Sequence, residues 1–145
     1  MVATYMVTPP PRILNLLTTA WIRLGLPPRK YHLLTVRGRK SGRFYSTPVA
    51  VVEDKGQRWL VAPFGEREWV KNARAAGQVV LRRGRRSETV AVIEELDPVH
   101  SAPILKRYSK KEPITRKCFD ATPDSPLEDF IEEAPLHPVF RILSH

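Results

Sequence analysis

The sequence predicts an α+β domain that is mainly β, with five or six strands in antiparallel hairpins that close into a small barrel and three or four helices around it. Three observations predict this fold. The 145 residues suit one domain, 1–145, large enough to bury a core. Short runs of β-branched and aliphatic residues follow one another across turn residues, and closing them into a barrel removes exposed strand edges. Strands and helices do not alternate regularly, which argues against a parallel doubly wound sheet.

The first half of the chain opens with a proline-rich, extended lead-in at Pro9–Pro11, followed by a predicted helix over 12–24. Apolar residues recur there at helical spacing, and Gly25 with the two prolines after it ends the helix. The strands that follow are expected at 31–36, which runs into a turn over 37–42, and at 47–53 and 57–62, which form a hairpin across 54–56.

The second half begins with a short helix that Gly77 ends and continues with another hairpin. Asp97 as N-cap with Pro98 at the first position then starts a further helix. A connector broken by prolines leads to the last elements. The predicted helices cover 66–76, 98–109 and 127–134, the strands 78–82, 87–94 and 139–143, and the proline-broken connector 112–126.

Basic residues are concentrated near the N-terminus. Residues 1–52 hold eight Lys and Arg side chains and no Asp or Glu, which gives this segment a charge of +8 out of a net +9. The other 93 residues hold 16 basic and 15 acidic side chains. An anionic partner is therefore expected at the N-terminal third, and a membrane, a nucleic acid and a phosphorylated cofactor all remain open.

Several classes of protein are excluded. No apolar run is long enough to span a membrane, since polar residues interrupt the longest one, 13–26. The N-terminus does not have the pattern of a secretory signal. Cys118 is the single cysteine, so a reduced, cytoplasmic protein is expected. The four histidines show no metal-ligand spacing, and we expect no metal site.

The segment 37–43 is the strongest candidate for ligand binding. Two glycines free its backbone N–H groups, while Arg37, Arg39, Lys40, Arg43 and the Ser41 hydroxyl supply charge and donors for a phosphate. Its spacing is neither that of a Walker A loop nor that of a Rossmann fingerprint. A solvated basic hairpin turn remains an equal alternative from spacing alone.

A second candidate is the strand-to-helix turn 62–65, whose glycine would let a flat ligand approach the backbone. Asn72 lies in the helix after it, where asparagine has poor propensity, so we expect its side chain to bond a neighbouring turn. No residue shows the pattern of a catalytic nucleophile, acid or base. If the protein is an enzyme, a cofactor carries the chemistry.

Five motifs in order resemble the deazaflavin-dependent nitroreductase family, actinobacterial oxidoreductases that use coenzyme F420. The resemblance runs from about residue 12 to residue 143 and implies a split β-barrel of about six mostly antiparallel strands with peripheral helices. The motifs are LTVRGRKSGR at 34–43, TPV at 47–49, VAPFG at 61–65, WVKNARA at 69–75 and HPVF at 137–140.

The resemblance implies that the chain is an enzyme that holds F420 in a groove. The glycine-rich loop would grip the phosphate and oligoglutamate tail, the next two motifs would lie along the deazaflavin ring, and the W-x-x-N helix would pack near the coenzyme. The implied cofactor-binding residues are Arg37, Gly38, Arg39, Lys40, Ser41, Gly42, Arg43, Thr47, Pro48, Val49, Ala62, Pro63, Phe64, Gly65, Trp69, Asn72 and Arg74.

The implied reaction is hydride transfer from C5 of reduced F420 to a flat, electron-poor acceptor: a quinone, an enone or a nitroaromatic. Nitroimidazole-activating members resemble W-Y-H-N where this chain has WVKN at 69–72, which leaves the acceptor open. No catalytic acid is assigned. The barrel would also suit FMN or haem, and a non-catalytic protein that binds an anionic ligand is a further alternative.

Two interaction surfaces remain open. Too few aromatics accompany the basic segment for a single-strand-binding platform, so we expect no nucleic-acid partner. Residues 12–26 could instead contact an anionic membrane through Trp21 and flanking arginines, although a helix that covers one barrel end is favoured. We favour a homodimer, because split barrels commonly dimerise.

Overall fold

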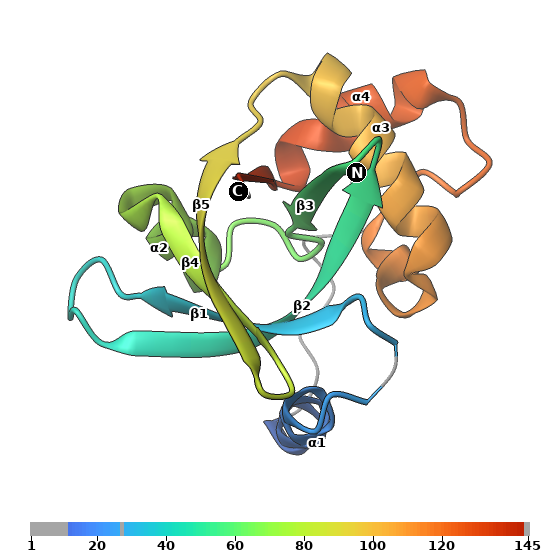
Figure 1. Cartoon of the computed structure of the whole chain (residues 1–145). Coiled ribbons are helices and arrows are strands. Elements are labelled where there is room, and N and C mark those ends of the chain that lie inside the picture. The colour runs from blue at the N-terminus through green and yellow to red at the C-terminus, as the bar shows by residue number, and fades with distance from the viewer. Residues whose placement is uncertain (1–11, 27, 144–145) are drawn as a thin grey trace.

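The computed structural model describes residues 12–26 and 28–143; the predicted lead-in at Pro9–Pro11 and the end of the chain at 144–145 lie outside these ranges. Six antiparallel strands close into a barrel in the order β1-β2-β3-β6-β5-β4 (Figure 1), which confirms the predicted fold class. The strands are β1 (Tyr31–Arg37), β2 (Phe44–Asp54), β3 (Gln57–Val61), β4 (Gln78–Arg83), β5 (Arg86–Glu94) and β6 (Val139–Leu143).

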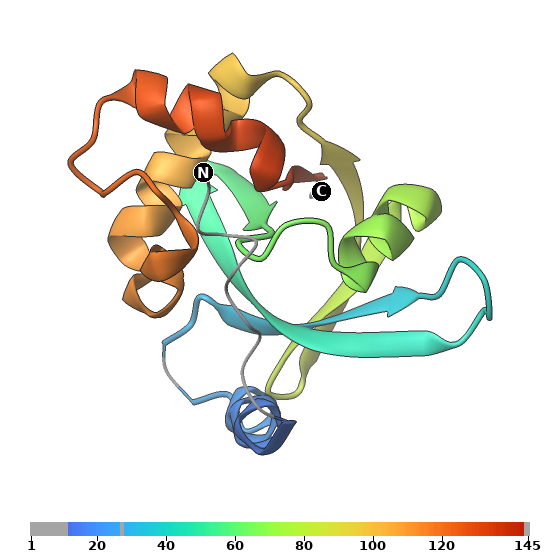
Figure 2. The ribbon, with the colours of Figure 1, turned by 180° about the vertical axis from the view of Figure 1, so that it is seen from behind.

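The helices lie around the barrel (Figures 1 and 2). α1 lies below the β4–β5 turn, α2 lies beside β1 and β4, and α3 with α4 forms a layer over β2, β3 and β6. The helical segments are α1 (Arg12–Arg23), α2 (Glu68–Ala76), α3 (Pro98–Lys111), η2 (Pro113–Cys118), α4 (Leu127–Glu133) and η3 (Ala134–Leu136).

Two apolar clusters follow from the alternation of side chains along the strands. The first fills the barrel interior and is closed by Val70, Ala73 and Trp69 of α2. The second lies between the outer face of β2, β3 and β6 and the helices α3 and α4. Because β2 contributes to both clusters, Val49 and Val51 point inward while Ala50 and Val52 point toward the helices.

The hairpin of β1 and β2 is longer than predicted. The expected start of the second strand, Thr47, is wrong by three residues, because Phe44, Tyr45 and Ser46 continue the ladder opposite the end of β1. Pro48 is tolerated inside this strand because β3 pairs with β2 only from Val51 onward, which leaves one edge of β2 without a ladder at the proline. The hairpin therefore projects beyond the barrel (Figure 1).

Another boundary differs from the expectation, and one segment contains a helix that was not expected. α2 begins at Glu68 and not at residue 66, because Arg67 keeps an extended N-cap conformation. The connector over 112–126, for which no helix or strand was expected, contains the 3-10 helix η2. Asp97 does cap α3 as predicted, with its side chain accepting a 3.0 Å hydrogen bond from the Val99 N–H.

Candidate functional site

The basic loop, which we define as residues 37–43, lies against the first turn of α2. Arg39 makes this contact: its Nη1 donates to Glu68 Oε2 and to Asn72 Oδ1, each at 2.8 Å. Its backbone N–H donates to the same Asn72 Oδ1 at 3.1 Å. The loop is thus tied to the helix at two positions one turn apart.

Asn72 has the role that its poor helix propensity predicts. The residue is 4% exposed, and its side-chain oxygen bonds the neighbouring turn through Arg39. A buried amide needs hydrogen-bond partners, and the loop supplies them. This confirms the expectation that the side chain of Asn72 bonds a neighbouring turn.

The backbone of the basic loop is held by contacts of its own. The Gly38 N–H donates to Arg43 O at 2.6 Å, and the Gly42 N–H donates to Gly38 O at 3.0 Å with Gly42 at φ 73°. A Cβ on Gly38 would lie 2.7 Å from the Tyr45 ring. Ser41 Oγ lies 3.1 Å from Tyr45 Oη and accepts from the Arg43 N–H at 3.2 Å. The loop therefore presents a defined surface.

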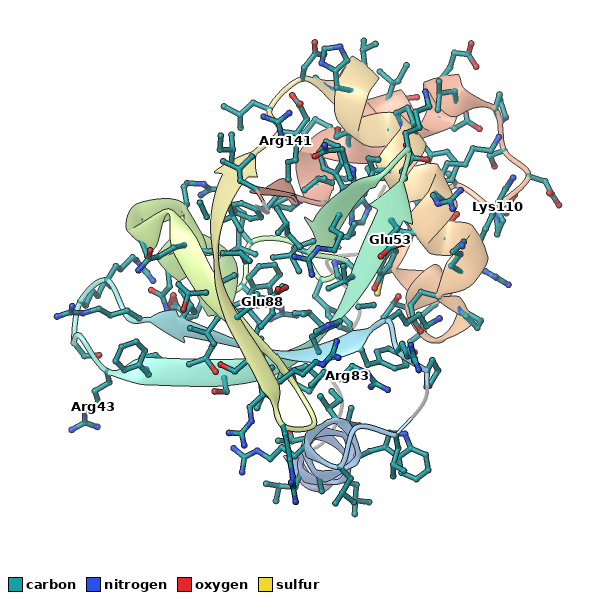
Figure 3. The ribbon with its side chains drawn as sticks, in the orientation of Figure 1. Arg43, Glu53, Arg83, Glu88, Lys110 and Arg141 are labelled. Atoms are coloured by element: carbon teal, nitrogen blue, oxygen red, sulfur yellow. The ribbon has the colours of Figure 1, made fainter. Side chains whose placement is uncertain are left out.

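The surface of the basic loop carries positive charges that no carboxylate neutralises. Within the described part of the chain, the side chains of Lys40 and Arg43 have no hydrogen-bond or ion-pair partner, and both are exposed. Figure 3 shows Arg43 projecting away from the end of the hairpin. The hydrogen bond from Arg39 lowers the pKa of Glu68, and the nearby charges of Lys71 and Lys40 lower it further. The Glu68 carboxylate is therefore held in its ionised form by the cations around it.

The turn Ala62–Gly65 leads from β3 toward α2. Ala62 is buried in the barrel interior and Gly65 takes φ 85°, a conformation that favours glycine. The guanidinium of Arg67 lies 5.8 Å from the centre of the Phe64 ring. Trp69, at the start of α2, packs against Phe140 with ring centres 6.0 Å apart. The turn and the basic loop are therefore brought to the same end of α2.

The buried pair of His137 and Glu133 contacts the backbone of the turn 62–65. His137 Nδ1 lies 3.1 Å from Pro63 O, and His137 Nε2 lies 3.0 Å from Glu133 Oε1. Both ring nitrogens thus face an acceptor. Burial alone would raise the pKa of Glu133, but the bonds from His137 and from the N–H groups of Ala121 and Asp120 outweigh it and lower that pKa.

Some predicted residues lie apart from the loop. Thr47, Pro48 and Val49 pair with β1 in the body of the sheet, and Val49 points into the barrel core. Arg74 is already paired, since its Nε lies 2.6 Å from Glu94 Oε1 and its Nη2 lies 2.8 Å from Glu66 Oε1. These two carboxylates raise the pKa of Arg74 and neutralise its charge.

Sequence reasoning missed two residues of the site. Tyr45 packs on Gly38 and bonds Ser41, and Glu68 pairs with Arg39. The glycine at 38 was a signal for the first, because such a position often admits a close neighbour. Glu68 lies four residues before Asn72, which places both on one face of α2.

The model of the F420H2-dependent quinone reductase family matches residues 19–105, which is more than half of the chain. The chain belongs to this family. The enzyme class and the cofactor expected from the sequence are thereby confirmed: the protein is an F420H2-dependent reductase, and its cofactor is coenzyme F420. No curated protein matches the chain.

Solved structures share the fold of this family member and confirm the predicted split barrel. One described as a domain-swapped dimer is 22% identical, with a TM-score of 0.56, over 91% of this chain and 92% of that chain. An F420-H2 dependent reductase is 20% identical, with a TM-score of 0.52, over 79% and 95%. A FAD-binding protein from Mesorhizobium loti is 14% identical, with a TM-score of 0.54, over 90% and 88%.

The donors of this reductase fit a coenzyme as acidic as F420. A phosphate and a carboxylate tail require cations that are not already neutralised, and Lys40 and Arg43 are such cations. Arg39 is instead paired with Glu68 of α2, and Arg74 is paired with Glu66 and Glu94. The residues present therefore suit an acidic coenzyme.

A cavity of about 340 Å3 opens where β1 and β4 separate beyond the pair Thr35–Val80. Of the predicted site residues, only Arg37 lines it. Its other lining residues are Thr35, Val36, Phe44, Ala76, Gln78, Val79, Val80 and Thr89. The predicted ring contacts at 47–49 and 62–65 thus lie outside this cavity.

Within residues 12–26 and 28–143, no group of three or more His, Cys, Asp or Glu side chains could hold a metal ion. No helix in the same ranges has the length and apolar character needed to cross a membrane.

Proposed function

We propose that this reductase transfers two electrons to a flat, electron-poor organic acceptor, and that the acceptor is a quinone. The description of the matching family supports this choice. An enone or a nitroaromatic shares the same chemistry. When bound, reduced F420 supplies the hydride from C5, and no residue of this chain is assigned as the proton donor.

The basic loop carries the proposal. Lys40 and Arg43 bind the phosphate and the oligoglutamate tail, because both are exposed loop cations without a carboxylate partner in the described chain. Arg37 borders the same surface at the end of β1. Arg39, Gly38, Ser41 and Gly42 fix the shape of the loop.

The other predicted contacts are proposed with smaller roles. The turn 62–65 lies along the ring, supported from behind by His137. Thr47 and Pro48 face the ring, whereas Val49 takes part through its backbone because its side chain is in the core. Trp69 keeps α2 against the barrel. Arg74 holds α2 to β5 through its ion pair with Glu94, so we assign it a supporting role near the coenzyme.

The acceptor class is tested by following the oxidation of reduced F420 in the presence of the purified protein and a panel of acceptors. Quinones are expected to give the highest kcat/KM, above enones and nitroaromatics of similar size. Turnover with enones or nitroaromatics but with no quinone would contradict the proposal. Boiled protein with each acceptor controls for direct reduction.

We also propose a homodimer, supported by the domain-swapped dimer among the structures that share the fold. Light scattering after size exclusion should give twice the mass of the chain. A monomeric mass at micromolar concentration would contradict this assembly.

A further inference from the structure

One helix of the molecule turns its apolar side outward. Four large side chains of α1 or its last turn are more than half exposed: Leu16 at 69%, Leu17 at 64%, Trp21 at 51% and Leu24 at 73%. With 100° between successive helical residues, these four and the exposed Ala20 fall within an arc of about 140°. We call these five residues the α1 face.

The orientation of this helix is fixed by the β4–β5 turn. Ile22, on the opposite side of α1, is 1% exposed, and its carbonyl accepts from the Gly84 N–H at 3.0 Å. Arg83 donates to the carbonyls of Gly25 at 2.8 Å and Leu26 at 3.0 Å. Gly25 and Gly84 meet so closely that a Cβ on Gly84 would lie 3.3 Å from the Gly25 Cα. The outward apolar side therefore belongs to a helix that is held in place.

Arginines border the α1 face. Arg23 is on the helix itself, and Arg82, Arg85 and Arg86 are on the β4–β5 turn that packs against it. Figure 3 shows the turn with its basic side chains beside α1, and Arg83 near its base. None of the four pairs with a carboxylate of the described chain. We call these four residues the arginine rim.

We propose that the α1 face and the arginine rim together form a docking surface for an anionic lipid bilayer. The leucines and Trp21 would enter the interface, where an indole is favoured because it is apolar with one polar group. The rim would meet lipid headgroups, since each basic residue near an anionic surface adds attraction. The surface would bring this reductase to the phase where lipid-soluble quinones dissolve.

Charge distinguishes this partner from a second copy of the chain. In a symmetric contact the same patch meets itself, so the unpaired arginines of one copy would face those of the other. Residues 12–52 contain no carboxylate that could compensate. An anionic surface, by contrast, satisfies the rim and covers the apolar face at once.

The test is co-sedimentation of the full chain with vesicles of phosphatidylcholine alone and of phosphatidylcholine with phosphatidylglycerol. Binding to the anionic vesicles is expected to be at least roughly tenfold tighter and to weaken with salt. The double variant Trp21→Ser/Leu24→Ser and the double variant Arg85→Glu/Arg86→Glu should each lose about tenfold or more in apparent affinity.

Matched controls keep the test specific. Leu96→Ser removes an apolar side chain that is 80% exposed far along the chain from α1, and Arg43→Glu reverses an unpaired arginine of the basic loop. Both should bind vesicles like the original chain, and thermal unfolding shows that each variant folds. Absence of binding to anionic vesicles, or equal binding by all variants, overturns the proposal. Loss of a dimer in Trp21→Ser/Leu24→Ser without any vesicle binding assigns the face to a second copy and overturns it as well.

Discussion

Asn72 shows how one buried amide positions a binding loop that it does not belong to. Its oxygen accepts from the backbone and from the guanidinium of Arg39, so the loop and α2 share one hydrogen-bonded centre. A poor helix former inside a predicted helix pointed to this bond from the sequence alone. The sequence did not indicate that Arg39 is itself part of the anchor, because its pairing with Glu68 and Asn72 joins residues that only the fold brings together.

Replacing Asn72 with Ala should therefore loosen the loop. We expect Asn72→Ala to lower the free energy of unfolding by about 1–2 kcal/mol, since the Arg39 N–H loses its acceptor. Affinity for F420 should fall as well, because the loop loses its anchor on α2. Asn72→Asp keeps an acceptor in place and should retain more of both, as measured by denaturant unfolding and F420 titration. A larger loss in Asn72→Asp than in Asn72→Ala would contradict the anchoring role.

Glu133 makes stability depend on acid. Its pKa in the folded state lies below the ordinary value, so its contribution is fully present above the unfolded pKa and is lost as the pH falls through the folded pKa. Unfolding measured from pH 7 down to pH 3 should show a decline below about pH 4.5. In Glu133→Gln the stability at pH 7 should be about 2 kcal/mol lower and this part of the decline should be missing. An unchanged acid profile would refute the role of the carboxylate.

The His137–Glu133 pair illustrates what sequence reasoning could not reach at this scale. The HPVF motif drew attention to His137, but its partner and the Pro63 carbonyl come from separate segments. The helix over 127–134 is rich in acidic residues, yet Glu133 is 5% exposed whereas Glu128 and Glu132 are exposed. Burial of one carboxylate among several is set by packing, which periodicity alone does not reveal.

The β1–β2 hairpin is the element on which the candidate site depends. Its turn residues were predicted from glycine and charge, but its length was not, because strands that pair only with each other carry little apolar signal beyond the barrel. Phe44 and Tyr45 are 69% and 49% exposed, so this part of the strand lacks the alternation of buried apolar and exposed polar residues that predicts a strand. These residues are instead held in a strand by the β1–β2 ladder, which runs from the pair Arg37–Phe44 to the pair Tyr31–Ala50.

Gly38 tests this element directly. A methyl group there would lie 2.7 Å from Tyr45 Cε2 and 3.2 Å from Arg43 O, so Gly38→Ala must displace the ring or the loop backbone. We expect a loss of about 1–3 kcal/mol in stability and weaker F420 binding. Adding Tyr45→Ala should recover part of the stability by making room. Urea unfolding of the single and double variants measures both effects, and additive losses would show that the ring is not the obstacle.

On the scale of the whole molecule, the fold divides the N-terminal charge between two surfaces. The basic loop holds four of the eight cations of residues 1–52 at one end of the barrel. Arg23 lies at the end of α1, beside the β4–β5 turn. The sequence predicted the barrel because short β-branched and aliphatic runs follow one another across turns, and closing such strands into a barrel removes their edges. Its six-strand order, with β6 between β3 and β5, joins distant segments and could not be read from local patterns.

The measurement that tests the central claim most directly is a fluorescence titration of F420 with the purified protein, repeated with a deazaflavin that lacks the oligoglutamate tail. We expect saturable binding of F420 in the micromolar range or tighter. Lys40→Ala should weaken F420 by roughly tenfold and the tail-free compound far less, while Arg85→Ala, which removes an exposed arginine elsewhere, changes neither. Equal losses for both ligands in Lys40→Ala, or no saturable binding of F420 by the original chain, would contradict the account.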